Sequence, residues 1–149
     1  MTKRLVILAL AIMTFAAATK ALKAADEDAL CPLGNATLKG TYMLRGEGFV
    51  VPSGQAPEPA TVVGWLTYDG KGSVTKASMT VSVNGTISTG TFSAPYTVNK
   101  DCSGSVEPPG QHYTFVVTPD GKNVYFIQTD TGTVSSGTEV RLTPLHEDD

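Results

Sequence analysis

The sequence has few of the residues and motifs from which metal and catalytic sites are usually built. It contains two cysteines and two histidines, neither cysteine belongs to a CxxC pair, and no carboxylate stands at ligand spacing around His112. No serine occupies a GxSxG turn, and the glycine-rich stretches precede no helical pattern that could cradle a phosphate. We therefore expect no metal and no cofactor, and an enzyme is the less favoured class.

Apart from one segment, the sequence also lacks long apolar runs. Lys3 and Arg4 precede an apolar run over Leu5–Ala18, followed by small residues, which is typical of a secretory signal peptide. The run has 14 residues, whereas a membrane-spanning helix needs roughly 20. We predict a signal peptide over 1–24, a mature start between Thr19 and Asp26, no membrane span, and a secreted or periplasmic location.

Positive charge is scarce once this leader is removed. Seven basic residues then remain against fourteen acidic ones, which gives the mature chain a net charge of −7. An acidic surface repels nucleic acid and anionic lipid, so we expect neither as a partner. Roughly 125 residues remain, enough for one domain with a single core.

The two cysteines are the basis for one prediction about the fold. In the oxidising compartment implied by the leader, two cysteines and no third predict a Cys31–Cys102 disulfide, with a free thiol or a metal ligand as alternatives. The bridge would close a loop of about 70 residues and contribute on the order of 4 kcal/mol. It would join an N-terminal arm, 25–37, to the tip of a distant hairpin.

Helical periodicity is absent from the rest of the chain, which alternates between β-rich runs and tight turns. Gly, Asn and Asp in these turns, as at Asn84–Gly85, accept the positive φ that hairpins require. Short links join antiparallel neighbours, and only the proline-rich segment Pro52–Pro59 is a long connection. The predicted strands are Leu38–Val50, Thr61–Tyr68, Ser73–Val83, Thr86–Asn99, Ser103–Glu107, His112–Thr118, Asn123–Thr129 and Thr133–Leu142.

A meander of this kind has two outer edges, and closure into a barrel removes them. We therefore predict an all-β fold, an antiparallel up-and-down meander of about eight strands closed into a small barrel over 38–143, followed by an acidic tail, 144–149; a sandwich is the alternative. Alternation predicts an inward face that consists of Tyr42, Leu44, Phe92, Ala94, Tyr96, Val98, Tyr113, Phe115, Val117, Val140 and Leu142. The candidate cavity residues among them are Tyr42, Leu44, Phe92, Tyr96, Tyr113 and Phe115.

Two of the strands are apolar on both faces. Trp65 opposes Leu66 in GWLTY, and Phe126 opposes Tyr125 and Ile127 in NVYFIQ. A barrel can bury only one side chain in two, so part of its outside should also be covered. The cover is either the N-terminal arm or another subunit in a homo-oligomer.

Four charged residues form the one candidate polar group, Arg45 and Glu47 on the first strand and Glu139 and Arg141 on the last. In a closed meander these strands pair, which allows Arg45 to face Glu139 across the seam. A solvated ion pair worth under about 1 kcal/mol is the favoured interpretation. The alternative is a polar floor inside the barrel that orients a ligand or performs acid–base chemistry.

Several segments resemble a known family. LKGTY, GWLTYDGKGSVT, NGTISTGTFSAPYTVNKDCSG and TPDGKNVYFIQTDTGTVSSGT are similar to the recurrent pattern of small secreted bacterial proteins grouped as allene oxide cyclase barrel-like. The resemblance spans about Cys31 to Leu142, and the DCxG turn is its most specific element. It implies an eight-stranded antiparallel barrel with an apolar cavity, and a trimer like that of the plant cyclases. No catalytic residue of those enzymes aligns with a position here, so their activity is not transferred.

Three functions remain open. The favoured classes are a binding module for a small apolar ligand and a structural or interaction protein with a filled barrel. The alternative is a cofactor-independent isomerase or cyclase that acts on a small hydrophobic substrate, with Tyr96, Tyr113 or the charged group supplying polarity. A cavity would count against the filled barrel, and a buried ionisable side chain in it would favour the enzyme over the simple binder.

Overall fold

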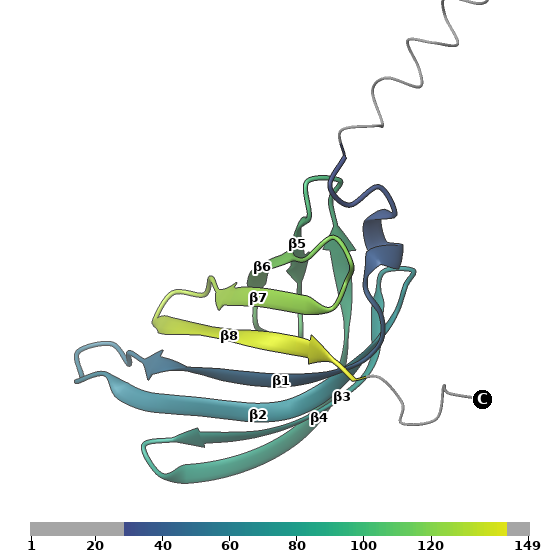
Figure 1. The fold of residues 1–149 in the computed structure, drawn as a ribbon. Coiled ribbons are helices and arrows are strands. Elements are labelled where there is room, and N and C mark those ends of the chain that lie inside the picture. The colour runs from purple at the N-terminus through teal and green to yellow at the C-terminus, as the bar shows by residue number, and fades with distance from the viewer. Residues whose placement is uncertain (1–28, 143–149) are drawn as a thin grey trace, which may run out of the picture.

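A computed structural model describes residues 29–142 of the chain. The described part is an eight-stranded antiparallel barrel in which each strand pairs with its sequence neighbours and β8 pairs back with β1 (Figure 1). A short 3₁₀ helix, η1 (Gly34–Thr37), precedes β1 (Lys39–Val50), β2 (Glu58–Asp69), β3 (Ser73–Val83), β4 (Thr86–Val98), β5 (Ser103–Val106), β6 (Tyr113–Val117), β7 (Asn123–Gln128) and β8 (Thr133–Arg141). The predicted all-β meander is confirmed, whereas the predicted signal peptide and acidic tail lie outside the described residues.

The strand boundaries agree with the sequence to within one residue, except at the start of β2. That strand begins at Glu58, three residues before the predicted Thr61, because β1 continues to pair with it as far as Val50. Pro59 is tolerated there even though it lacks an N–H, and its carbonyl accepts a hydrogen bond from the Asn84 amide. The loop between β1 and β2 is therefore shorter than predicted.

The inward face was predicted correctly on β1, β4 and β6 but not on β8. Val140 and Leu142 are 43% and 47% exposed, whereas Glu139 is only 3% exposed. The register explains this: Leu44 on β1 lies opposite Glu139, and side chains directly opposite each other in a sheet share a face. Since Leu44 points inward, Glu139 must do so too.

The two strands with apolar residues on both faces are now assigned. Leu66 and Tyr68 point inward while Trp65 lies outside, half-buried beneath the Lys76 ammonium at 5.4 Å from its ring centroid. On β7, Phe126 points inward, and Tyr125 and Ile127 stay 57% and 53% exposed. The described part of the arm does not cover them, because η1 packs against β4. A covering subunit stays a prediction.

The barrel has two unlike ends, which we call the disulfide end and the mouth (Figure 1). The disulfide end contains η1, the Cys31–Cys102 bridge and the turns β2–β3, β4–β5 and β6–β7. The mouth contains the turns β1–β2, β3–β4 and β7–β8. Residues 96–98 of β4 pair with β5, and the Pro95 carbonyl accepts a hydrogen bond from the Glu107 amide just beyond it, so residues 86–94 have β3 as their single strand neighbour. Closure is thus confined to the disulfide end, and one edge remains open towards the mouth.

The predicted disulfide is present, with a Cα–Cα distance of 5.1 Å between Cys31 and Cys102. Cys102 adopts a positive φ of 68°, an unusual conformation for a residue other than glycine. Its backbone is held on both sides, because its amide donates to the Asn99 carbonyl and its carbonyl accepts from the Val117 amide. The cysteine in this β4–β5 turn therefore links the N-terminal arm covalently to the hairpin and, through the bond from Val117, to the end of β6. Among residues 29–142, no helix is long and apolar enough to cross a membrane.

Candidate ligand-binding cavity

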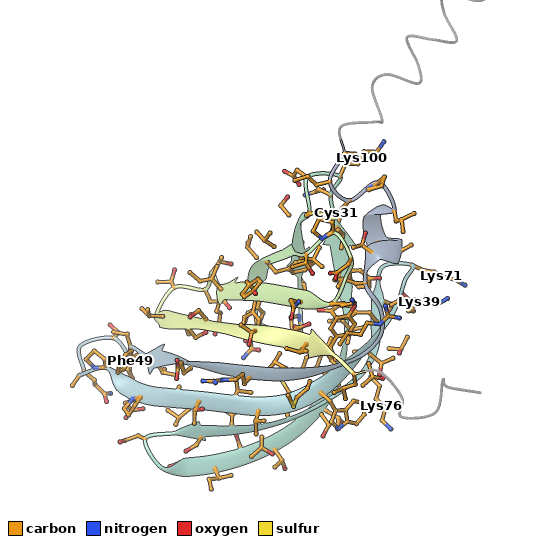
Figure 2. All side chains as sticks on the ribbon, in the orientation of Figure 1. Cys31, Lys39, Phe49, Lys71, Lys76 and Lys100 are labelled. Carbon is orange, nitrogen blue, oxygen red and sulfur yellow. A yellow bond between two sulfur atoms is a disulfide. The ribbon has the colours of Figure 1, made fainter. Side chains whose placement is uncertain are left out.

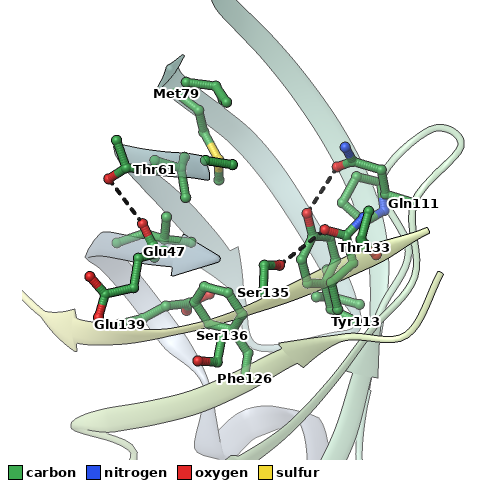
Figure 3. A pocket seen from close by; sticks show the side chains of 18 of the residues that line it. Glu47, Thr61, Met79, Gln111, Tyr113, Phe126, Thr133, Ser135, Ser136 and Glu139 are labelled. Carbon is green, nitrogen blue, oxygen red and sulfur yellow. Dashed lines mark hydrogen bonds between the residues drawn. The ribbon is translucent and has the colours of Figure 1, made fainter. Parts of the chain in front are cut away.

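A cavity of about 240 Å³ occupies the barrel interior on the mouth side (Figure 3). It extends from Tyr68 and Val74 to Val50, Val83 and Thr133, the mouth-end residues of β1, β3 and β8. Most of its wall is apolar, and the further lining residues include Leu44, Val62, Leu66, Met79, Val81, Phe92, Val106, Tyr113 and Phe126. The size and character suit a small organic ligand.

Two glycines shape one wall of this cavity. Gly46 on β1 and Gly137 on β8 lie opposite each other, and Phe126 on β7 pairs with Gly137. A Cβ at Gly137 would stand 2.4 Å from the Phe126 ring and 2.3 Å from the Arg45 carbonyl oxygen, and one at Gly46 would stand 3.2 Å from the same ring. The aromatic ring therefore packs directly over bare backbone; a side chain at Gly137 would clash with it, and one at Gly46 would fit only if its neighbours shifted.

Glu139 is the buried ionisable group of the cavity. Its Oε2 accepts a hydrogen bond of 3.0 Å from the Tyr68 hydroxyl, and the residue is 3% exposed. Burial raises the pKa of the Glu139 carboxyl from 4.5 to about 7, and the bond from Tyr68 opposes part of this rise. Near neutral pH the Glu139 carboxyl can therefore be either neutral or ionised, whereas a surface carboxylate or a fully paired one would be ionised.

A cluster of tyrosines supports Glu139 from the disulfide end. The Tyr68 ring packs edge-on against Tyr42 and Tyr96, with ring centroids 5.2 and 4.8 Å apart. The Tyr42 hydroxyl donates to the Gly121 carbonyl, and burial raises its pKa to about 12. The Tyr96 hydroxyl lies 2.8 and 3.0 Å from the carbonyl oxygens of Asn35 and Leu38. Each hydroxyl thus has a fixed acceptor, and that of Tyr68 is the Glu139 carboxyl.

A second polar network lies beside the mouth. Asp130 accepts hydrogen bonds from the His112 amide and Gln128 Nε2, and its Oδ1 lies 2.6 Å from His112 Nδ1. Gln128 in turn accepts a bond from the Ser135 hydroxyl. The bonds from Gln128 and His112 lower the pKa of Asp130 to about 2, and the Asp130 carboxylate raises that of His112. The network joins the start of β6 to the β7–β8 turn.

The candidate cavity residues divide into two groups. Leu44, Phe92 and Tyr113 line the cavity, whereas Tyr42, Tyr96 and Phe115 are buried outside it. Figure 3 shows Tyr113 and Phe126 together on one wall, with ring centroids 5.7 Å apart. Sequence reasoning missed Phe126 as a lining residue because both faces of its strand were apolar.

The predicted charged group does not act as a unit. Arg45 pairs with Glu47 at 3.9 Å, and both side chains are exposed, by 72% and 76%. Arg45 lies opposite Thr138 rather than Glu139, so the expected cross-seam pair is wrong, and Arg141 is exposed at the disulfide end. Glu139 alone turns into the barrel, as the less favoured polar-floor interpretation required of it.

Two further sequence inferences concern the histidines. Asp130, eighteen residues from His112, is its partner, and no spacing rule could have found it because the β6–β7 hairpin brings the two together. Within residues 29–142, no group of three His, Cys, Asp or Glu side chains is arranged to hold a metal ion. His146 lies outside that range.

No protein-family model matches the sequence, and no curated protein matches it closely enough to indicate a relationship.

Proposed function

We propose that the protein binds a small, largely apolar ligand inside the barrel, with Glu139 as its polar contact. The observation that carries this proposal is the 240 Å³ cavity with apolar walls and one buried carboxyl. Such a cavity argues against a barrel that merely fills itself with side chains. Glu139 is the buried ionisable group of this largely apolar site, and a hydrogen bond to its carboxyl would orient a ligand.

The disulfide supports a working location for this binder. Structural disulfides persist in oxidising compartments, which agrees with the leader-like N-terminal sequence. We infer a secreted or periplasmic carrier or sensor of a small molecule.

The binding site is tested by filling it. Val62 lines the cavity, whereas its neighbour Val63 points outward and is 56% exposed. The neutral fluorescent probe N-phenylnaphthylamine should bind the wild type and the Val63→Trp variant alike. Val62→Trp places an indole in the cavity and should weaken binding at least about tenfold, which is the loss of little more than one kilocalorie per mole. Equal binding by all three proteins would place the probe elsewhere and remove the support for the cavity.

A second candidate function is a cofactor-independent isomerase or cyclase. The observation that favours it is the Glu139–Tyr68 pair, since a buried carboxyl whose pKa lies near 7 is suited to general acid–base catalysis. An enzyme would return a bound ligand as an isomer of equal mass and altered chromatographic retention. Glu139→Gln should bind the same ligand and return it unchanged, whereas a simple binder returns it unchanged from both proteins.

A further inference from the structure

The charged residues that border the cavity are all acidic. Among the described residues that border it, the charged ones are Glu47 and Glu139, and none is Lys, Arg or His. An anionic ligand would therefore lose its hydration without gaining a cationic partner, a large cost in an apolar site. A ligand with a carboxylate or phosphate buried in the cavity is excluded on these grounds.

Glu139 has an unused acceptor. Tyr68 bonds to its Oε2, and Oε1 has no hydrogen-bond partner among the described residues. Among the described residues, Thr37 Oγ1 is the fully buried side-chain atom that lacks a hydrogen-bond partner. Glu139 Oε1 therefore keeps some accessible surface, which is open to the cavity that Glu139 lines. A ligand group that donates hydrogen bonds and carries positive charge would satisfy this atom best.

The aromatic walls suit the same kind of group. The rings that line the cavity are Phe49, Tyr68, Phe92, Tyr113 and Phe126. The faces of aromatic rings attract cations, and this attraction increases when water is excluded. A carboxyl together with several rings, and without any basic side chain, is the composition expected of an ammonium site.

The charges over the rest of the molecule also favour a cationic ligand, because the basic residues gather at the end opposite the mouth. Of the seven basic residues in 29–142, Lys39, Lys71, Lys76, Lys100, Lys122 and Arg141 lie at or near the disulfide end, where Asp69, Asp101 and Asp120 accompany them. In Figure 2, Lys39, Lys71 and Lys100 lie around Cys31, Lys76 lies lower on the same right-hand side, and Phe49 lies at the far left. The remaining one, Arg45, is already paired with Glu47. On the cavity side, Glu58 and Glu107 lie at the mouth, and Asp130 is paired there with His112, so the unpaired charge at the mouth is acidic and attracts cations.

From these observations we infer that the ligand is a small apolar amine, whose ammonium group pairs with the Glu139 carboxylate while its hydrocarbon part lies against the aromatic and aliphatic walls. This inference rests on the proposed ligand-binding function and narrows it to one chemical class.

Binding of this kind must depend on pH, because the ammonium requires an ionised Glu139. The groups that face the carboxyl are Tyr68 on β2 and Tyr42 on β1, whose pKa values are both raised, so they stay neutral. The exposed Arg141 lies further along β8. With the pKa of free Glu139 at about 7, affinity should fall about tenfold per pH unit below that value and level off above it. Below pH 7, binding should release a proton.

Three ligands of nearly equal shape test the inference by calorimetry on the wild type: phenylbutylamine, phenylbutanol and phenylbutyric acid. At pH 8 the amine should bind about tenfold more tightly than the alcohol, and the acid should show no binding. Amine affinity should fall about thirtyfold between pH 8 and pH 5.5, whereas that of the alcohol should stay nearly constant. Heats measured at pH 6 in buffers of different ionisation enthalpy should reveal the released proton.

The variant Glu139→Gln separates charge from shape. It should lose the preference for the amine over the alcohol at pH 8, and its amine affinity should no longer fall between pH 8 and pH 5.5. A wild type that binds the alcohol or the acid as tightly as the amine at pH 8 overturns the amine inference and leaves the binding function intact. If N-phenylnaphthylamine binds and none of the three ligands does, the amine inference is likewise overturned and the binding function stands. If none of the four probes binds, both the amine inference and the binding function are overturned.

Discussion

The disulfide end and the mouth of this barrel are made from the same eight strands but differ in how much they bury. At the disulfide end, Tyr42, Val74, Val117 and Val124 are at most 1% exposed, and the bridge and η1 close the barrel over them. Towards the mouth, β4 is exposed at every position from 86 to 91, and Ile87 is 70% exposed. Packing density and strand pairing therefore decline from one end to the other.

This difference divides the tasks of the molecule. The disulfide end supplies the buried apolar area that stabilises the fold, at roughly 25 cal/mol per Å². The mouth buries less apolar area, and the interior behind it stays accessible to a ligand. Glu139 lies at the boundary, where the tyrosine cluster holds its carboxyl at the inner limit of the cavity.

The largest effect should come from opening the disulfide end. Replacing both Cys31 and Cys102 by serine removes a cross-link between positions 71 residues apart and should lower the free energy of unfolding by about 4 kcal/mol, because the unfolded chain regains its freedom. Denaturant titration of the variant against the oxidised wild type measures this. A loss below about 1 kcal/mol would mean that packing alone closes this end.

The next effect concerns the boundary residue. Because folding raises the pKa of Glu139 from 4.5 to about 7, the folded state binds the extra proton, and this contribution to stability is complete below pH 4.5 and lost as the pH rises to 7. Glutamine imitates the neutral acid and keeps an acceptor for Tyr68. The Glu139→Gln variant should match the wild type at pH 4 and be more stable by on the order of 3 kcal/mol at pH 8.

Thermal or denaturant unfolding of both proteins over this pH range provides the measurement, and the difference between them isolates Glu139 from Asp130 and His112. A difference that does not change with pH would show that the carboxyl is not desolvated in the folded protein.

The sequence allowed the fold to be predicted because local signals were strong. Turn residues such as Asn84–Gly85 fixed the hairpins, and alternation fixed the inward side of β1, β4 and β6. With only two cysteines in the sequence, each had a single possible disulfide partner. Nothing local, however, showed that β4 would extend past its partner β5, so the closed barrel still leaves one side of residues 86–94 without a strand partner.

The site was predicted less well, for a physical reason. On β8, Val140 and Leu142 are the more apolar residues, and alternation alone turned them inward; the register with β1 reverses the choice and buries Glu139. A buried carboxyl violates the local rule that charged residues face water. Such violations concentrate at functional sites, which is why the error fell on the residue of most interest.

The smallest effects come from a matched pair of truncations, one at each end. Val124 is 0% exposed at the disulfide end, and Val134, near the mouth, is 63% exposed. Val124→Ala removes two methyl groups from a close-packed site and should cost about 2 kcal/mol, including the cavity it leaves. Val134→Ala removes the same atoms from solvent and should change stability by less than about 0.5 kcal/mol. Denaturant midpoints at constant slope give both values. Equal losses would show that something covers the outer face around Val134 in solution, as a second subunit would, and the two ends would then be equally buried.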